Sequence, residues 1–210
     1  MNRRDSRSRQ QLNVDSPIFP VDTMIVSIIA SPRPDGYGTA LARRAAEGAE
    51  SVGKEVKEYR LNDMTSFRQC QNCEACKKVG KCVLKDDISP IIDDIRDAEG
   101  VILCTSINFN DADGLFKMVL DRFYCFLDAN ASTILPKGKK VMVIVTAGAD
   151  DSSADRVATD LEKVMTQHFF FESVGRIAYC TWMMPVGMPI DDDILDKAYG
   201  SGRGFSSGSS

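Results

Sequence analysis

The chain has 210 residues, and its contents of 43% hydrophobic and 27% charged residues are ordinary for a globular protein. The formal net charge of −4 gives no reason to expect nucleic acid as a partner. No apolar run approaches the roughly 18 residues of a membrane span, and the first residues lack the apolar core of a signal peptide, so we expect a cytoplasmic protein without a membrane segment.

Both ends of the chain differ in composition from the stretch between them. Residues 1–22 hold four arginines among serine, asparagine and glutamine, which predicts a flexible N-terminal arm. Residues 200–210 are rich in glycine and serine, which predicts a disordered C-terminal tail. Residues 23–199 contain enough apolar residues for one folded domain.

Within this domain, apolar runs rich in β-branched residues alternate with helical patterns. The expected strands are residues 24–30, 56–61, 100–105, 140–146 and 175–181. The expected helices are residues 39–52, 89–98, 114–127, 152–170 and 191–199. This alternation predicts an α/β doubly wound sheet of five parallel strands. The order 2-1-3-4-5 is the flavodoxin-like arrangement, which places ligands at the carboxyl ends of strands one, three and four.

The loop after the first strand has the composition of a phosphate site. It offers the hydroxyls of Ser31 and Thr39, the guanidinium of Arg33 and the backbone of Gly36 and Gly38, just before a helix N-terminus. The G-x-G-x-x-G pattern and the P-loop lysine are both missing from it, so neither a dinucleotide fingerprint nor a nucleoside triphosphatase is indicated. A plain turn between a strand and a helix is the alternative.

A cysteine-rich loop, residues 68–87, follows the second strand. Four of the seven cysteines, Cys70, Cys73, Cys76 and Cys82, have the spacing C-x2-C-x2-C-x5-C. This spacing can aim four thiolates at one iron-sulfur centre, whereas a zinc ribbon keeps its two cysteine pairs well apart in sequence. An odd number of cysteines also argues against a secreted disulfide framework. The alternative is a set of reduced or structural cysteines beside a flavin.

Three stretches together carry a resemblance to a known family. They are Ser31-x-Arg33, the end of the cysteine loop at residues 80–87 (GKCVLKDD), and residues 109–122 with their closing KMVLDR. In these stretches the chain resembles the iron-sulfur flavoprotein branch of the NADPH-dependent FMN reductase family, over about residues 24–192. The resemblance implies a flavodoxin-like fold that binds FMN, with a [4Fe-4S] cluster on Cys70, Cys73, Cys76 and Cys82. It also implies that electrons pass between cluster and flavin across the interface of a homodimer or homotetramer.

The resemblance assigns the flavin-binding residues to three loops. The phosphate would be held by Ser31, Arg33, Gly38 and Thr39, with Gly36 and Tyr37 in the same loop. The isoalloxazine ring would lie along Thr105, Ser106, Ile107, Asn108 and Phe109. The far edge of the ring would be lined by Thr146, Ala147, Gly148 and Asp150. No catalytic side chain is required, because the cofactors supply the electron chemistry.

Three functions follow from these patterns. The first is a redox protein that passes electrons between a [4Fe-4S] cluster and FMN, with NAD(P)H or a ferredoxin as redox partner and a small molecule as electron acceptor. The second is a cluster-free NAD(P)H-dependent FMN, quinone or nitroaromatic reductase. The third, from another class, is a metal-binding or redox-sensing module.

Overall fold

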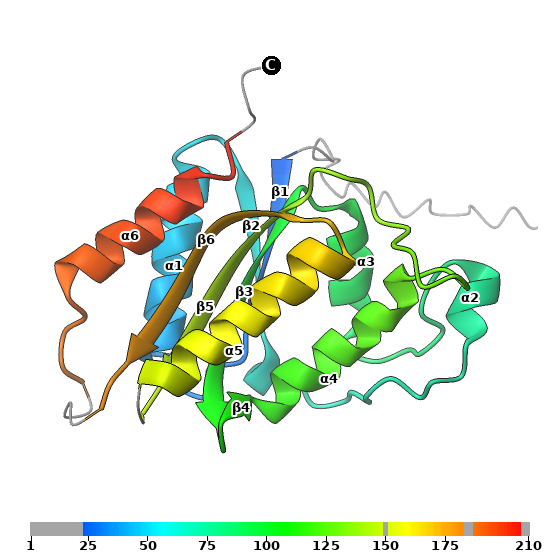
Figure 1. Cartoon of the computed structure of the whole chain (residues 1–210), viewed down its shortest axis with the longest axis horizontal. Coiled ribbons are helices and arrows are strands. Elements are labelled where there is room, and N and C mark those ends of the chain that lie inside the picture. The colour runs from blue at the N-terminus through cyan, green and yellow to red at the C-terminus, as the bar shows by residue number, and fades with distance from the viewer. Residues whose placement is uncertain (1–22, 149–150, 183–186, 207–210) are drawn as a thin grey trace, which may run out of the picture.

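The computed structural model describes residues 23–148, 151–182 and 187–206 (Figure 1). The predicted N-terminal arm at residues 1–22 lies outside the described residues, as do Asp150 and the last part of the predicted tail, residues 207–210. None of the helices within the described ranges is long and apolar enough to cross a membrane.

A parallel sheet forms the centre of the molecule. Its strands are β1 (Met24–Ile29), β2 (Glu55–Arg60), β3 (Gly100–Asn108), β5 (Lys140–Ala147) and β6 (Glu172–Cys180), in the order β2-β1-β3-β5-β6. All four neighbouring pairs are parallel. Because β5 and β6 are the fourth and fifth strands of the prediction, the predicted five-stranded flavodoxin-like order is confirmed.

The composition of each strand fits its place in the sheet. The interior strands β1, β3 and β5 are almost entirely buried because helices cover both of their faces, which explains their continuous apolar runs. The edge strand β2 reads EVKEYR and is largely exposed. Charged residues on an edge strand discourage pairing with other chains.

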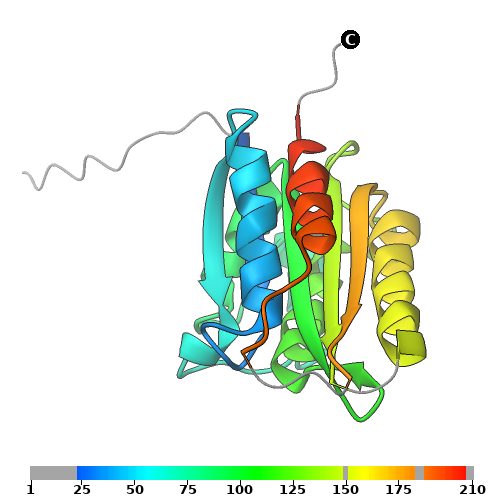
Figure 2. The same ribbon diagram turned by 90° about the vertical axis from the view of Figure 1, so that its left-hand side faces the viewer.

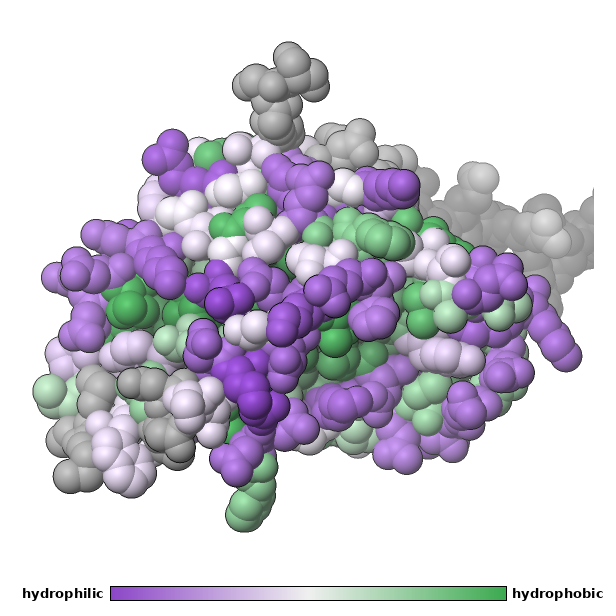
Figure 3. All heavy atoms as spheres, viewed as in Figure 1, coloured by the Kyte–Doolittle hydropathy of each residue, from purple (hydrophilic) through white to green (hydrophobic). Residues whose placement is uncertain are grey.

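Two layers of helices cover the sheet. The helices are α1 (Tyr37–Glu50), α2 (Ala75–Val79), α3 (Ser89–Asp97), α4 (Gly114–Arg122), α5 (Asp151–Lys163) and α6 (Asp192–Arg203). Short 3₁₀ turns lie at η2 (Leu61–Asp63) and η3 (Phe123–Phe126), and a π-helical turn, η4 (Val164–His168), extends α5. Residues of α3, α4 and α5 pack in one apolar core, and residues of α1 and α6 pack in a second core. Figure 2 shows α1 and α6 in front of the sheet, and hydrophilic residues cover the outer sides of α4 and α5 (Figure 3).

The end of the chain corrects the sequence analysis. The prediction of a disordered tail from residue 200 onwards is wrong for residues 200–206. In the structure, α6 continues to Arg203 and the Phe205 side chain is completely buried. The glycines that suggested a linker allow close packing instead. A Cβ atom at Gly202 would lie 1.9 Å from the carbonyl oxygen of Ala45 on α1. Only glycine therefore lets α6 approach α1 so closely.

The third strand is longer than predicted. Ser106, Ile107 and Asn108, which follow the predicted strand, also belong to β3. A short strand β4 (Asp111–Ala112) pairs with the end of β3 in antiparallel fashion. The turn between them consists of Phe109 and Asn110, with left-handed φ angles of 49° and 66°. Two successive residues with positive φ are typical of the tightest hairpins, although asparagine or glycine is usual there. Because Phe109 is not a typical turn residue, the sequence did not indicate this turn.

Candidate functional site

A pocket of about 190 Å³ lies at the carboxyl ends of β1, β3, β5 and β6. Eleven of the predicted flavin-binding residues line it: Ser31, Arg33, Gly36, Tyr37, Gly38, Ser106, Ile107, Asn108, Thr146, Ala147 and Gly148. Pro32 and Thr181 complete its wall. Topology alone brings these residues together, because the carboxyl ends of parallel strands share one edge of the sheet.

The loop after β1 is closed by hydrogen bonds to one carbonyl. The oxygen of Arg33 accepts from the Gly36 backbone nitrogen at 3.1 Å, the Ser31 hydroxyl at 3.3 Å and the Thr39 hydroxyl at 3.0 Å. Gly38 packs against the sheet, since a Cβ atom there would lie 3.0 Å from the Cys104 sulfur. The loop is therefore short, tight and close to the strand ends.

The first turn of α1 is suited to an anion. At its N-cap, Gly36, no side-chain hydrogen bond is made within the described residues. The first backbone N–H groups of a helix lack partners inside the helix and carry the positive end of its dipole. Arg33 is exposed beside this turn, and Arg60, at the end of β2, donates to the Thr39 hydroxyl at 3.4 Å. These groups form the surroundings that a phosphate group requires.

Arg60 was missed by the sequence analysis. Its side chain is only 11% exposed and also pairs with Asp63. The predicted strand order could have indicated Arg60. Strand two neighbours strand one, so the last residue of strand two lies beside the first loop.

Four predicted residues do not line the pocket. The Thr39 hydroxyl bonds within its own loop, and the Thr105 hydroxyl accepts from the Asp113 backbone nitrogen at 3.1 Å, which stabilises the turn from β3 to β4. Phe109 is fully exposed, with a relative accessibility of 103%. Asp150 lies outside the described residues.

A larger cavity of about 770 Å³ adjoins the strand-end pocket. The two share Arg33, Gly36 and Tyr37, and the segment before α6 adds Met188 and Ile190 to the walls of the larger one. The larger cavity lacks the hydroxyls and amides of the strand ends. The smaller pocket therefore has the polar groups suited to an anion, and the larger cavity adds space beside it.

The four predicted metal ligands lie together in a different part of the molecule. Cys70, Cys73, Cys76 and Cys82 line one cavity with Arg122, Tyr124 and Cys125. At about 20 Å³ this cavity holds little more than a water molecule. Within residues 23–148, 151–182 and 187–206, no three His, Cys, Asp or Glu side chains are placed to hold a metal ion. The loop thus gathers four thiols around one cavity, which in this conformation is too small for a metal cluster.

Backbone turns and one lysine shape this loop. Asn72 and Glu74 have left-handed φ angles of 47° and 56°, so the chain folds back sharply between the cysteines. The single turn α2 carries Cys76 and Lys77. The Lys77 ammonium donates to the carbonyls of Tyr124 and Leu127, both at 2.6 Å. This lysine fastens α2 to the turn that follows α4.

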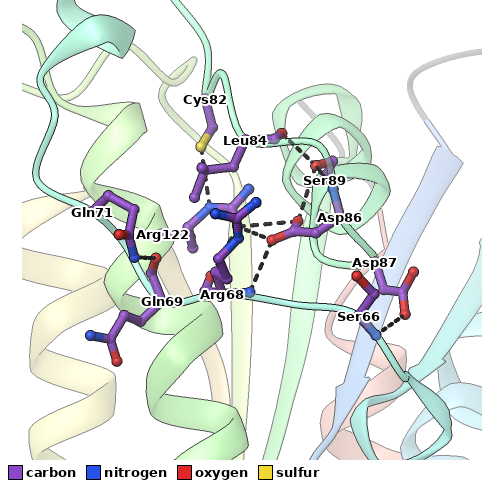
Figure 4. Close-up of polar contacts among 10 residues, drawn as sticks. All are labelled: Ser66, Arg68, Gln69, Gln71, Cys82, Leu84, Asp86, Asp87, Ser89 and Arg122. Carbon is purple, nitrogen blue, oxygen red and sulfur yellow. Dashed lines mark hydrogen bonds and ion pairs between the residues drawn. The ribbon is translucent and has the colours of Figure 1, made fainter.

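An ion pair inside the protein holds the base of the loop (Figure 4). The side chains of Asp86 and Arg122 are 3% and 0% exposed, and their nearest oxygen and nitrogen are 2.9 Å apart. Arg122 also donates from Nε to the sulfur of Cys82 at 3.1 Å and from Nη1 to the Arg68 carbonyl at 3.1 Å. The sequence analysis assigned no role to Arg122. The signal available in the sequence was a charged residue among the apolar positions of the predicted helix at residues 114–127.

Burial and charge act on the acidic groups of this region. Burial raises the pKa of the Cys76 thiol, and the charge of Lys77 opposes that rise. Burial raises the pKa of the Cys125 thiol to about 12. For Asp86, burial works toward a higher pKa, but the hydrogen bond from Arg122 and the other contacts outweigh it and hold the pKa below its ordinary value. Asp86 therefore stays charged and keeps its pair with Arg122.

The order of the parallel strands, with a polar pocket at their carboxyl edge, defines a flavodoxin-like fold. Residues 23–180 match the family described as NADPH-dependent FMN reductase, and the chain belongs to that family. The family that the sequence resembles is therefore confirmed.

Curated relatives match parts of the chain. An iron-sulfur flavoprotein of Methanocaldococcus jannaschii is 34% identical over 98 residues, which cover 47% of this chain and 50% of that protein. An iron-sulfur flavoprotein of Archaeoglobus fulgidus is 29% identical over 125 residues, or 60% of this chain and 62% of that protein. In these matches the chain spans about half to three fifths of the length of its relatives.

Solved structures share the fold. An NAD(P)H:quinone oxidoreductase from Methanothermobacter marburgensis has a TM-score of 0.64 at 17% identity, covering 89% of this chain and 98% of that one. An FMN-dependent NADH-azoreductase from Bacillus anthracis has a TM-score of 0.60 at 13% identity, covering 86% and 96%. At such low identity, the likeness shows the fold alone.

Proposed function

We propose that the chain is an iron-sulfur flavoprotein that passes electrons between a [4Fe-4S] cluster and FMN. The observation that carries this proposal is the gathering of four cysteines around one cavity, beside a buried arginine and apart from the strand-end pocket. The names of the archaeal relatives support the same function. A cytoplasmic location, where thiols stay reduced, belongs to the proposal.

The strand-end pocket is suited to FMN. Arg33 and the first turn of α1 would bind the phosphate, while the ends of β3 and β5 would border the ring. When bound, FMN exchanges two electrons and a [4Fe-4S] cluster exchanges one at a time, so together they would connect two-electron and one-electron partners. The protein's own residues would bind, orient and tune these groups.

Electron transfer would run between subunits. The flavin pocket and the cysteine cavity share no residue, and Figure 1 draws α2 on the far side of α4 from the sheet. We propose a homodimer or homotetramer that brings the cysteine loop of one subunit near the flavin of another. NAD(P)H or a ferredoxin would be the redox partner, and a small molecule would be the electron acceptor.

A cluster-free NAD(P)H-dependent FMN, quinone or nitroaromatic reductase is the second candidate. The small volume of the cysteine cavity favours it, since no room for a cluster is open there. The third function, a sensing module, has less support because the chain belongs to a family of oxidoreductases.

Anaerobic purification tests the proposal. The visible spectrum, the flavin content and the contents of iron and acid-labile sulfide are measured on the same sample. FMN with about four irons per chain supports an iron-sulfur flavoprotein. FMN without iron or sulfide, even after anaerobic reconstitution, contradicts it and favours the cluster-free reductase.

A further inference from the structure

Arg122 is the largest of the fully buried side chains in the part of the chain that the structure describes. Removing a charged group from water costs several kcal/mol unless other groups compensate. Asp86 supplies one opposite charge, and its carboxylate is already bound to the Arg68 backbone nitrogen at 3.0 Å and to the Ser89 hydroxyl at 3.1 Å. Such a costly arrangement next to four thiols suggests that more than one acceptor compensates the guanidinium.

The hydrogen bonds of Arg122 leave one of its nitrogen atoms unused. A guanidinium offers five N–H donors in a rigid plane. Nε donates to the Cys82 sulfur, and Nη1 donates to Asp86 and to the Arg68 carbonyl. Nη2 is buried and has no hydrogen-bond partner among the described residues. Buried donors in native proteins are nearly always satisfied, so an acceptor is missing here.

The missing acceptor can be located from the walls of the cysteine cavity. Arg122 lines this cavity together with all four cysteines of the loop, and its Nε already contacts one of their sulfurs. A thiolate-ligated cluster carries negative charge on its sulfur atoms, and hydrogen bonds to those atoms are common in such proteins. The unused donor therefore belongs to a residue that lines the cavity where a cluster would supply acceptors.

We propose that Arg122 is a positioning residue for the cluster and raises its reduction potential. Asp86 holds the guanidinium, Nε donates to the sulfur of Cys82, and Nη2 donates to a sulfur of the bound cluster. Reduction adds one negative charge to the cluster, and a buried cation with hydrogen bonds favours the more negative state. This inference rests on the proposed function and adds a specific determinant of the potential.

A purely structural role is the competing explanation. Arg122 could serve only to fasten the loop, through Asp86 and the Arg68 carbonyl, without acting on the cluster. Such a role affects stability and cluster retention but not the potential of a cluster that has been assembled. The reduction potential therefore separates the two explanations.

The test compares two substitutions that each remove one positive charge. Arg122→Gln removes the buried guanidinium, whereas Arg68→Gln removes an exposed guanidinium two residues before Cys70. Anaerobically reconstituted proteins are titrated at controlled potential, and the fraction of reduced cluster is followed by electron paramagnetic resonance. FMN content and thermal unfolding show whether each variant is folded.

At the wild-type midpoint, we expect Arg122→Gln to lower the ratio of reduced to oxidised cluster about tenfold, which is about 59 mV for a one-electron couple. Because water screens exposed charges, Arg68→Gln should change that ratio less than about twofold. Equal ratios in the two variants overturn the inference.

If Arg122→Gln does not fold, a second variant, Arg122→Lys, takes its place in the test. Lysine retains the charge but cannot reach Asp86, the Arg68 carbonyl and Cys82 with one ammonium group. In Arg122→Lys we expect the ratio of reduced to oxidised cluster to fall about threefold below that of the wild type. A ratio equal to that of the wild type overturns the inference. If the wild-type protein assembles no cluster, both the proposed function and this inference are contradicted. A wild-type protein with a cluster and an unchanged ratio in the variants contradicts the inference alone.

Discussion

The strand-end pocket and the cysteine loop are built in different ways. The pocket takes its shape from the backbone at the ends of strands held in register, for example Thr105 opposite Val145 and Ser106 opposite Thr146. The loop has little regular structure and is held by side chains, chiefly Lys77, Asp86 and Arg122. Topology predicts the first kind of site, whereas the second depends on individual side-chain contacts that sequence spacing does not show.

This difference has a consequence for mutation. Changes in the loop should leave the proposed flavin pocket intact, because the pocket and the cysteine cavity share no lining residue. Changes in the pocket should leave the proposed cluster intact for the same reason. The following variants test that independence.

Cys76→Ser should have the largest effect. A serine oxygen is a poor substitute for a thiolate ligand, so nearly all iron and sulfide should be lost while FMN is retained. Cys125→Ala is the matched control, because Cys125 lines the same cavity outside the compact motif. Iron and flavin analyses of the two variants provide the measurement. Full iron content in Cys76→Ser contradicts the assignment of that ligand.

Arg33→Ala should weaken FMN binding roughly 10- to 100-fold, since a hydrogen bond to a charged group is worth about 1.5–3 kcal/mol. Iron content should stay at the wild-type level. The control is Arg43→Ala, which removes an exposed arginine of α1 that pairs with Glu58 of β2. Fluorescence titration of the flavin-free proteins measures the affinities, and equal affinities in both variants contradict the phosphate site.

Acid should loosen the cysteine loop of the cluster-free protein. The pKa of Asp86 in the folded protein lies below its ordinary value of 3.8, so its stabilising effect is complete well above pH 3.8 and is lost as the pH falls through the lower folded value. The protection factors for hydrogen exchange of residues 64–87, which correct for the slower intrinsic exchange in acid, should therefore fall over this range. In Asp86→Asn the exchange should be fast already at neutral pH. A loop whose protection is the same at pH 6 and below pH 3.8 contradicts the role of this pair.

Phe109→Asn should have the smallest effect on stability. The side chain is fully exposed and its backbone is left-handed, a conformation that asparagine tolerates better. The free energy of unfolding of the flavin-free protein should stay constant or rise by up to about 1 kcal/mol. The affinity for FMN should fall a few-fold if Phe109 lies along the ring as predicted. Chemical denaturation and flavin titration provide the two measurements, and an unchanged affinity removes Phe109 from the site.

The sequence predicted the parallel sheet and most of the pocket because hydrophobic periodicity and the ends of buried strands are local signals. It did not reveal β4, since a phenylalanine occupies a turn where glycine or asparagine is usual. It also gave no role to Arg122, whose partner Asp86 lies 36 residues away. Contacts between distant side chains leave no periodic trace in a single sequence.

The segment from α6 to Phe205 affects how the chain can fold during synthesis. Ala198 and Phe205 are buried in the core that α1 shares with one face of the sheet. A ribosome-bound chain that has released only the residues before α6 would expose the apolar surface that these side chains cover. This face of the sheet can therefore close only after residue 205 has left the ribosome.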